Sequence, residues 1–475
     1  MLKKMLCFVF VFTFCSLSIS AQDGAIDEKL LQKFESNVNT INNIDQLINM
    51  VTNNSIKDIS LNHEKVISHN ELYSHKLKKT GITDQASSGR CWAFAGNNLL
   101  SSKVMTDLQF SEFEMSESFI AFYDKLEKGN FFLERIIEMR DRPLDDRSLQ
   151  NELSGMFGDG GWHNYFLDIV KKYGMVPKEI MPETKQSAST GMLNNLGQTL
   201  LRSYASELLQ MHKDGKKLKA LRARKDELLG ELYHFLVLNY GKPPKSFVYR
   251  YEFKDKDDTT KTEKQIIEKE YTPKSFFDTY FGSSLPEYVA IVNNPAMEFN
   301  KAYLLKESRN IYENSDFTVI NLPIEDLKNY ARKSILDSQA VWFACDIGKD
   351  NYRNDALLKT DIYDYSKTLG IDFSLSKRDR ILYHDMSPNH AMVLTGLDTA
   401  QTGETVKWLV ENSWGKKAGD DGYWNMYDDW FSEYILLIVV DKNLLSDEHK
   451  KLFDSKPQII ADWEPFFLAL KHLEY

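Results

Sequence analysis

The segment DQASSGRCWAF, residues 84–94, surrounds a cysteine with residues that a buried structural cysteine does not need. Apolar side chains recur at helical spacing from residue 91 to about 108, and the small residues SSG before them are typical of a helix start. Cys91 is therefore predicted to lie at the N-terminus of a helix, where the helix dipole favours a thiolate. We interpret Cys91 as a nucleophile, with Trp92 and Phe94 holding its helix in place.

A thiol nucleophile needs a base, and a suitable pattern follows far along the chain. His390 opens HAMVLTG, which reads as a buried strand, and Asn412 ends the next such strand, in KWLVENSWG. An amide that accepts from one imidazole nitrogen would turn the other nitrogen toward the sulfur, and Trp414 would shield that hydrogen bond from water. The backbone N–H of Cys91 and the side-chain amide of Gln85 are then predicted to be the two donors to an oxyanion.

The start of the chain has the pattern of a secretory signal peptide. Residues 1–21 join Lys3 and Lys4 to an apolar run and then to small residues, so we expect cleavage after Ala21. A retained membrane anchor is the alternative, but the run is short for a span of about 20 residues. We therefore expect export to the periplasm or the medium, with no stable membrane insertion after cleavage.

The composition is that of a globular protein, with 42% hydrophobic and 27% charged residues. The formal net charge of -10 argues against nucleic acid or anionic lipid as the main partner. After loss of the leader, the cysteines that remain are Cys91 and Cys345, too few for a disulfide scaffold. Cys345 falls in a predicted buried strand, WFACDIG, so we interpret it as structural and expect no bridge to Cys91.

Helical patterns dominate the first half of the chain and strand patterns the second, which indicates an α+β fold. We expect a polar helical arm at 25–55, a glycine loop at 158–161 before a helix at 162–173, helices at 190–240 and an exposed loop at 254–265. The basic run KKLKALRARK, 216–225, is interpreted as the solvated face of an amphipathic helix rather than a nucleic-acid patch. His63, His69 and His75 do not share one helical face, so no metal site is expected. The predicted strands are EYVAIVNN (287–294), SDFTVINLP (315–323), AVWFACDIG (340–348), HAMVLTGLD (390–398), TVKWLVENSW (405–414) and YILLIVV (434–440).

Several of these motifs together resemble papain-type cysteine peptidases. They are Gln85, CWAF at 91–94, the His390 strand and NSWGKKAGDDGYW at 412–424. Ser88 stands where secreted papain-like enzymes usually have a disulfide cysteine. His390 also follows Cys91 by 390 - 91 = 299 residues, against roughly 130 to 150 in papain itself. Both features resemble the bleomycin hydrolase and aminopeptidase C branch (peptidase C1B type), as do DGGW, KKYGMVPKEIMPET, MLNNLGQTLLR, GKPPKSFVYRY and VWFACDIGK across the mature chain.

The resemblance implies a papain-like α+β fold with a helical left half, a β-rich right half and a large helical insertion at about 185–290. It implies one domain over 22–475, with an N-terminal arm and a C-terminal tail at about 455–475. It also implies that Cys91 is the nucleophile and His390 the general base. Asn412 would be the orienting amide and Gln85 the oxyanion donor. Substrate binding is assigned to the backbone of Gly160 and Gly161, which would otherwise only form a turn, and to Asn389.

The resemblance also implies an activity, an aminopeptidase that hydrolyses peptides through a thioester and needs no cofactor or metal. Members of the branch form homohexamers in which the C-terminal segment lies in the cleft. Here the ending resembles the branch around Trp463, Glu464 and Pro465, yet the chain continues to residue 475. An endopeptidase or dipeptide-releasing peptidase with the same site therefore stays open, as does a non-catalytic peptide-binding module.

Overall fold

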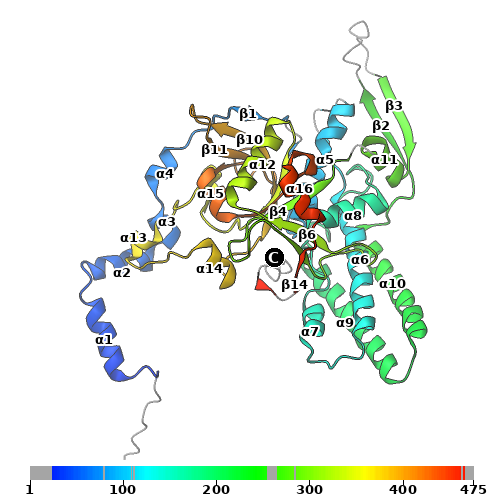
Figure 1. The fold of residues 1–475 in the computed structure, drawn as a ribbon, viewed down its shortest axis with the longest axis horizontal. Helices are drawn as coiled ribbons and strands as arrows, with labels where there is room; N and C mark the ends of the chain where they lie inside the picture. The colour runs from blue at the N-terminus through cyan, green and yellow to red at the C-terminus, as the bar shows by residue number, and fades with distance from the viewer. Residues whose placement is uncertain are drawn as a thin grey trace, which may run out of the picture. The chain divides into compact units, whose positions relative to one another are not determined.

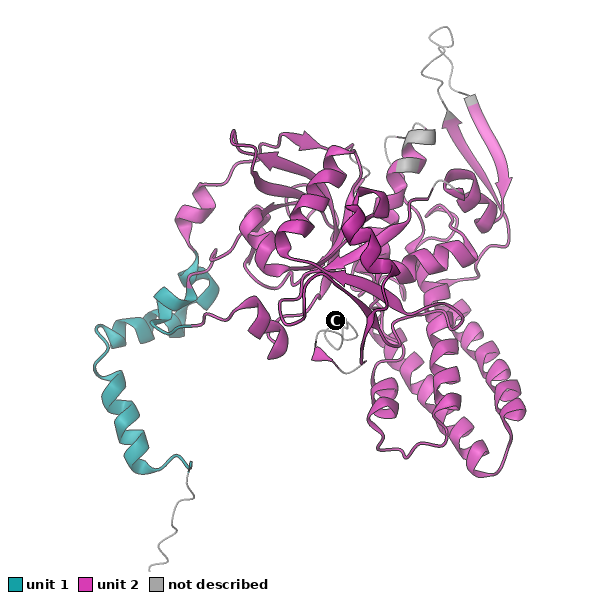
Figure 2. Cartoon of the chain, viewed as in Figure 1, with its two compact units in different colours: residues 1–61, 365–372 teal, residues 62–364, 373–475 magenta. Residues whose placement is uncertain are grey.

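The computed structural model describes residues 24–78, 81–108, 110, 113–253, 265–282, 285–461 and 464–465. These residues form two compact units, one within 1–61 with 365–372 and the other within 62–364 with 373–475 (Figure 2). The predicted signal peptide, nearly all of the loop predicted at 254–265, Trp463 and the chain after residue 465 lie outside the described residues. The helices of the described ranges do not combine the length and the apolar character that a bilayer span requires.

The first unit is a small group of helices, most of them from the N-terminal part of the chain and one from residues 365–372. It contains α1 (Glu28–Val38), α2 (Ile44–Asn53), α3 (Ile56–Ser60) and α13 (Tyr365–Leu369). The sequence predicted helix over 25–55, and the structure interrupts it between α1 and α2. The interruption ends at Asn43, whose left-handed φ of 61° suits an asparagine better than most residues.

The second unit has a helical region that begins with the helix of Cys91. It comprises α5 (Cys91–Leu108), α6 (Glu117–Glu138), α7 (Arg147–Ser154), α8 (His163–Tyr173), α9 (Gly191–Lys213) and α10 (Leu218–Tyr240). The helix predicted from residue 91 to about 108 is confirmed. Helices α6, α9 and α10 lie side by side (Figure 1), and α10 buries one stripe of leucines against the other two.

The basic run at 216–225 belongs to this helical region, and its interpretation needs a correction. It does form one face of an amphipathic helix, but part of that face is not solvated. Lys225 is only 8% exposed and pairs with Glu134 of α6 at 2.7 Å, while Arg224 pairs with Glu207 of α9 at 2.6 Å. Lys225 and Arg224 therefore connect α10 to α6 and α9 through ion pairs.

The other region is one mixed sheet that contains every strand predicted from the sequence. Its order is β14 (Gln458–Ile460), β5 (Lys301–Leu305), β6 (Phe317–Asn321), β4 (Tyr288–Val292), β13 (Ile435–Asp441), β7 (Val341–Cys345), β10 (His390–Thr399), β11 (Thr405–Glu411), β12 (Tyr423–Tyr427), β9 (Leu357–Leu358) and β8 (Asn351–Tyr352), with β1 (His75–Lys76) on β10. Strands β7 and β13 are buried along their whole length, which matches their unbroken apolar sequences. The helices around this sheet are α4 (His63–Ile67), α12 (Ile324–Leu336), α14 (Lys377–Leu382), α15 (Asp428–Tyr434) and α16 (Asp447–Asp454).

The insertion predicted to be helical also contains β structure. Strands β2 (Phe247–Phe253) and β3 (Gln265–Tyr271) pair as an antiparallel hairpin, followed by α11 (Pro273–Tyr280). Alternate aromatic side chains of the hairpin pack on Phe276 of α11, namely Phe247, Tyr249 and Tyr271. The aromatic alternation in SFVYRY, next to a proline pair, was the signal for a strand at this place.

Candidate active site

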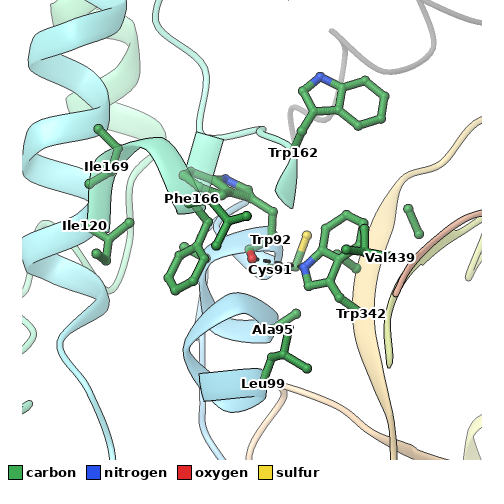
Figure 3. Packing of buried hydrophobic residues seen from close by; sticks show 14 of the residues in the cluster. Cys91, Trp92, Ala95, Leu99, Ile120, Trp162, Phe166, Ile169, Trp342 and Val439 are labelled. Carbon is green, nitrogen blue, oxygen red and sulfur yellow. Dashed lines mark hydrogen bonds between the residues drawn. The ribbon is translucent and has the colours of Figure 1, made fainter. Parts of the chain in front are cut away.

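Cys91 is the first residue of α5 and is buried, with 3% of its surface exposed. Figure 3 shows its sulfur beside the Trp342 indole, at the start of the helix. The N–H groups of Ala93 and Phe94 both donate to the carbonyl of Arg90, at 2.9 and 3.1 Å, which closes the first turn. The N–H of Cys91 belongs to the group of first-turn donors that have no partner within a helix.

The loop before Cys91 is fixed by Gln85, whose amide is held at both ends. Its oxygen accepts from the Ser413 hydroxyl at 2.7 Å, and its nitrogen donates to the carbonyl of Ser88 at 2.7 Å. Its backbone N–H donates to the carbonyl of Ser413 at 2.8 Å. The structure thus places Gln85 between the nucleophile helix and the segment that follows Asn412.

Arg90 secures the same loop from the other side. Its guanidinium is 1% exposed and makes a bidentate ion pair with Glu183, at 3.0 and 2.8 Å, besides donating to the carbonyl of Ser187. Burial raises the pKa of Glu183, but the Arg90 charge and the hydrogen bonds from Arg90, Ser187 and Ser118 together hold that pKa below its usual value. Because both charges are satisfied in one fixed geometry, the turn into α5 is rigid.

The structure brings His390 and Asn412 together as predicted. His390 begins β10 and Asn412 directly follows β11, and His390 Nε2 lies 2.8 Å from Asn412 Oδ1. The same oxygen accepts from the backbone N–H of Ser413 at 2.8 Å. A backbone N–H can only donate, so this contact fixes which end of the amide is the oxygen. His390 must then carry its hydrogen on Nε2, which leaves Nδ1 as the basic nitrogen.

Trp414 covers this pair, as expected from the sequence. Its indole stacks on the His390 ring with centroids 4.7 Å apart and planes at 27°, and Trp424 meets it edge-on. The Arg353 guanidinium lies 5.1 Å from the Trp414 ring. His390 is 4% exposed, and burial lowers its pKa to about 4 although the bond to Asn412 opposes that shift.

The expectation that the helix start and the imidazole favour a resting thiolate is not matched by the protonation of the site. Burial raises the pKa of the Cys91 thiol to about 11, and the N–H groups of Ala391 and Trp92, which lower it, do not compensate. Burial also keeps His390 neutral, so the resting site holds a thiol and an imidazole. The Ala391 contact nevertheless places the start of β10 against the sulfur.

The glycines predicted to bind substrate lie beside the nucleophile helix. A Cβ at Gly161 would come within 2.6 Å of the Trp92 indole, so packing alone requires a glycine there. The carbonyl of Gly160 accepts from Lys128 at 2.6 Å. The helix predicted after them is present as α8, which Gly174 ends with a φ of 85°.

Two further predicted residues flank His390. Asn389 donates to Asp346 at 2.7 Å and accepts from the N–H of Ile347 at 3.0 Å, so its amide closes a loop between β7 and β10. Its assignment to substrate binding stays a prediction. Cys345 pairs with His390 across the two strands and is fully buried. Both Cys91 and Cys345 are free thiols.

Some residues that build the site were missed by the sequence reasoning. Asp159, Glu183 and Ser413 receive or donate the hydrogen bonds that hold the catalytic loop. Asp159 directly precedes the two glycines, and Ser413 lies inside NSWG, so their positions in motifs were a usable signal. Glu183 lies inside KKYGMVPKEIMPET, so it too had a motif signal, but nothing in the sequence indicated its distant partner Arg90.

Comparison with known proteins places the whole arrangement in a family. The model of the peptidase C1-like family matches residues 25–467. The chain belongs to the peptidase C1-like family. This peptidase is 34% identical to aminopeptidase C of Streptococcus thermophilus, over 92% of this chain and 96% of that protein, and 37% identical to aminopeptidase C of Lactococcus lactis subsp. cremoris, over 83% and 88%.

A solved structure agrees with this peptidase over nearly its full length. It is PepW from Lactobacillus rhamnosis HN001, with a TM-score of 0.88 and 31% identity, covering 93% of this chain and 99% of PepW. The papain-like α+β fold and the resemblance to the aminopeptidase C branch are thereby confirmed. The chain is a cysteine peptidase.

Proposed function

We propose that this chain is a cysteine aminopeptidase that removes residues from the N-terminus of peptides, with Cys91 as nucleophile and His390 as base. The observation that carries the proposal is the His390–Asn412 hydrogen bond of 2.8 Å, whose direction leaves His390 Nδ1 basic. The residue next to His390, Ala391, contacts the Cys91 sulfur through its backbone N–H. His390 is therefore adjacent in sequence to a residue that touches the nucleophile. A binding module has no need of a basic nitrogen oriented in this way.

In the first half of the reaction, His390 Nδ1 takes the thiol proton as Cys91 Sγ attacks the carbonyl carbon of the scissile bond. The carbonyl oxygen becomes an oxyanion, stabilised by the N–H of Cys91 and by Nε2 of Gln85. Gln85 gives one of its two amide hydrogens to Ser88, and the second is the one offered to the oxyanion. His390 then returns the proton to the leaving amine, and a thioester to Cys91 remains.

In the second half, His390 takes a proton from water, which attacks the thioester carbonyl. The same two donors hold the second oxyanion. Its collapse expels the Cys91 thiolate, which takes the proton back from His390, and the carboxylic acid product leaves. Asn412 keeps the imidazole in one tautomer through both halves.

The neutral resting pair is compatible with this chemistry. Burial opposes a lone thiolate and a lone imidazolium alike. A proton that moves from Cys91 to His390 forms both charges at once, and the two titrate as a pair rather than separately. We infer that the ion pair forms when a substrate carbonyl is bound next to the donors.

Aminopeptidase rather than endopeptidase action rests on the relatives, which are named aminopeptidase C. The test is hydrolysis of one peptide series, with free and with acetylated N-termini, by the mature protein and by Cys91→Ala. Stepwise release of residues from the free peptides, lost in Cys91→Ala, is the expected result. Internal cleavage of the acetylated peptides would replace the proposal by an endopeptidase.

We also propose that the protein is exported and assembles into a homo-oligomer, a hexamer by resemblance. Residues 1–21 support export through their signal-peptide pattern. Terminal sequencing of the protein from separated cell fractions tests export, and a cytosolic protein with residues 1–21 intact would contradict it. Light scattering of the purified protein tests the hexamer, which a monomeric mass would exclude.

A further inference from the structure

Asp159 connects the loop before Cys91 to the glycine loop at 158–161 and forms a buried ion pair. Its carboxylate lies 2.9 Å from the ammonium of Lys125, and both side chains are nearly fully buried, at 3% and 1% exposure. The other carboxylate oxygen accepts from the N–H of Gly89 at 2.9 Å and from the Thr190 hydroxyl. Its backbone carbonyl accepts from the Trp92 indole at 2.6 Å.

These contacts join the loop that carries the nucleophile to the loop that carries the two glycines. Gly89 and Trp92 flank Cys91 at the start of α5, while Asp159 directly precedes Gly160 and Gly161. The loop before Cys91 has backbone hydrogen bonds to residues 413 and 188, which do not belong to the glycine loop. Within the described residues, Asp159 contacts both loops.

Helix α6 provides the support for this connection. Lys125 also donates to the carbonyl of Phe157 at 3.2 Å and to Asn194 at 2.7 Å. Lys128, three residues later, donates to the carbonyls of Gly158 and Gly160 at 3.2 and 2.6 Å. The glycine loop is thus fixed to α6 by both lysines, and Asp159 transmits that position to the nucleophile.

We propose that Asp159, paired with Lys125, is a positioning residue for peptide hydrolysis, which keeps the Cys91 turn in register with the substrate-binding glycine loop. The inference rests on the proposed function. Acyl transfer needs both the Cys91 turn and the glycine loop in position, whereas simple alkylation of the thiol needs only the Cys91 turn. Breaking the pair is therefore predicted to slow acyl transfer more than alkylation.

Asp159→Asn is the variant that tests this, because its shape is kept and its charge is lost. The amide offers one acceptor, so its NH₂ group must face either the Lys125 ammonium or the N–H of Gly89. One of the two contacts is lost in either orientation. The matched control is Glu134→Gln on α6, which makes the same chemical change beside a buried lysine, Lys225 of α10.

The measurements are kcat and KM on a free peptide, the pH dependence of Cys91 alkylation by iodoacetamide, and stability in urea. For Asp159→Asn we expect kcat to fall about 100-fold, while the alkylation rate of the fully ionised thiol stays at the wild-type value. We also expect the alkylation midpoint to move to lower pH, because the Asp159 charge opposes the Cys91 thiolate. Glu134→Gln should lose stability, but its kcat and its alkylation midpoint should stay at the wild-type values.

Unchanged kcat in folded Asp159→Asn, or an equal loss of kcat in both variants, would overturn the proposal. If Asp159→Asn does not fold, Thr190→Val removes only one donor to the carboxylate, and a several-fold fall in kcat is expected. An unchanged kcat in that variant also overturns the proposal. A wild-type protein that reacts with iodoacetamide but hydrolyses no peptide would instead contradict the proposed function, and the alkylation midpoint would still test the connection.

Discussion

The two halves of the site are held in different ways. The nucleophile half, on the loop before α5, depends on side chains, with Arg90 on Glu183 and Asp159 on Lys125. The base half depends on strands, because β10 is paired with β7 on one side and β11 on the other, and His390 and Asn412 stand at their ends. A strand receives its position from a ladder of backbone hydrogen bonds. The loop before α5 has only isolated backbone hydrogen bonds, and buried ion pairs add to them.

This difference predicts separate consequences for mutations. Mutations in the nucleophile half should reduce both stability and activity. Removing one member of the Arg90–Glu183 or Asp159–Lys125 ion pair leaves the other charge without its partner inside the protein. Damage to the base half should reduce activity with little effect on stability, because the sheet remains.

The largest effect is expected for His390→Ala, which removes the base and leaves the strand intact. Hydrolysis should fall by about 10⁴-fold, while stability in urea changes little. Steady-state kinetics beside an unfolding curve measure both. Cys345→Ala, opposite His390 on β7, is the control and should keep activity. A strongly destabilised His390→Ala would contradict the view that the sheet alone holds the base half.

Next in size is Arg90→Met, which leaves the partly buried Glu183 without its cation. We expect a loss of about 3–5 kcal/mol in the free energy of unfolding at neutral pH. The folded pKa of Glu183 lies below its reference value of 4.5, so its ionisation stabilises the protein above that value. This contribution is lost as pH falls through the folded pKa.

Urea unfolding of wild type and Arg90→Met across this pH range checks the prediction, and the gap between them should narrow in acid. Arg224→Met breaks an ion pair with Glu207 on α9, where both side chains are more exposed, and should destabilise the protein much less than Arg90→Met. Equal losses in the two variants would mean that burial of the Arg90 pair has no special importance.

A smaller effect is expected for Gln85→Ala, which removes one oxyanion donor from the nucleophile half. Losing such a donor typically lowers kcat by about 10²- to 10³-fold. Because the donor acts on the oxyanion, KM should change much less than kcat. A rise in KM with kcat unchanged would assign Gln85 to ground-state binding instead.

The smallest effect is expected for Gly161→Ala, which adds a methyl group against the Trp92 indole. Overpacking of this kind typically costs about 1–3 kcal/mol. Thermal or urea unfolding measures it, and Gly155→Ala, where a Cβ meets open space, is the control. Equal stability losses in Gly161→Ala and Gly155→Ala would show that the glycine loop can move to accommodate the methyl group. That result would weaken the case for a rigid connection through Asp159.

Much of the architecture was predictable from the sequence. The bounds of α5 follow from its apolar spacing, and the buried strands follow from unbroken apolar runs such as ILLIVV in β13. The hairpin β2–β3 was missed because it follows a helix-rich stretch and its aromatic alternation was not recognised as a strand pattern. Strands β5 and β12 were missed as well, and each pairs on one side with a strand far away in the chain, β14 and β9 respectively.

For the site, the sequence determined which side chains could do the chemistry, since thiol, imidazole and amide occur in recognisable local patterns. Only the tertiary structure decided how they are held and protonated. The tautomer of His390 depends on Ser413, and the raised pKa of Cys91 depends on burial by the whole fold. The Asp159–Lys125 pair joins residues that no periodicity relates. Periodicity is a local property of the chain, whereas desolvation and charge pairing depend on what the folded chain brings close together.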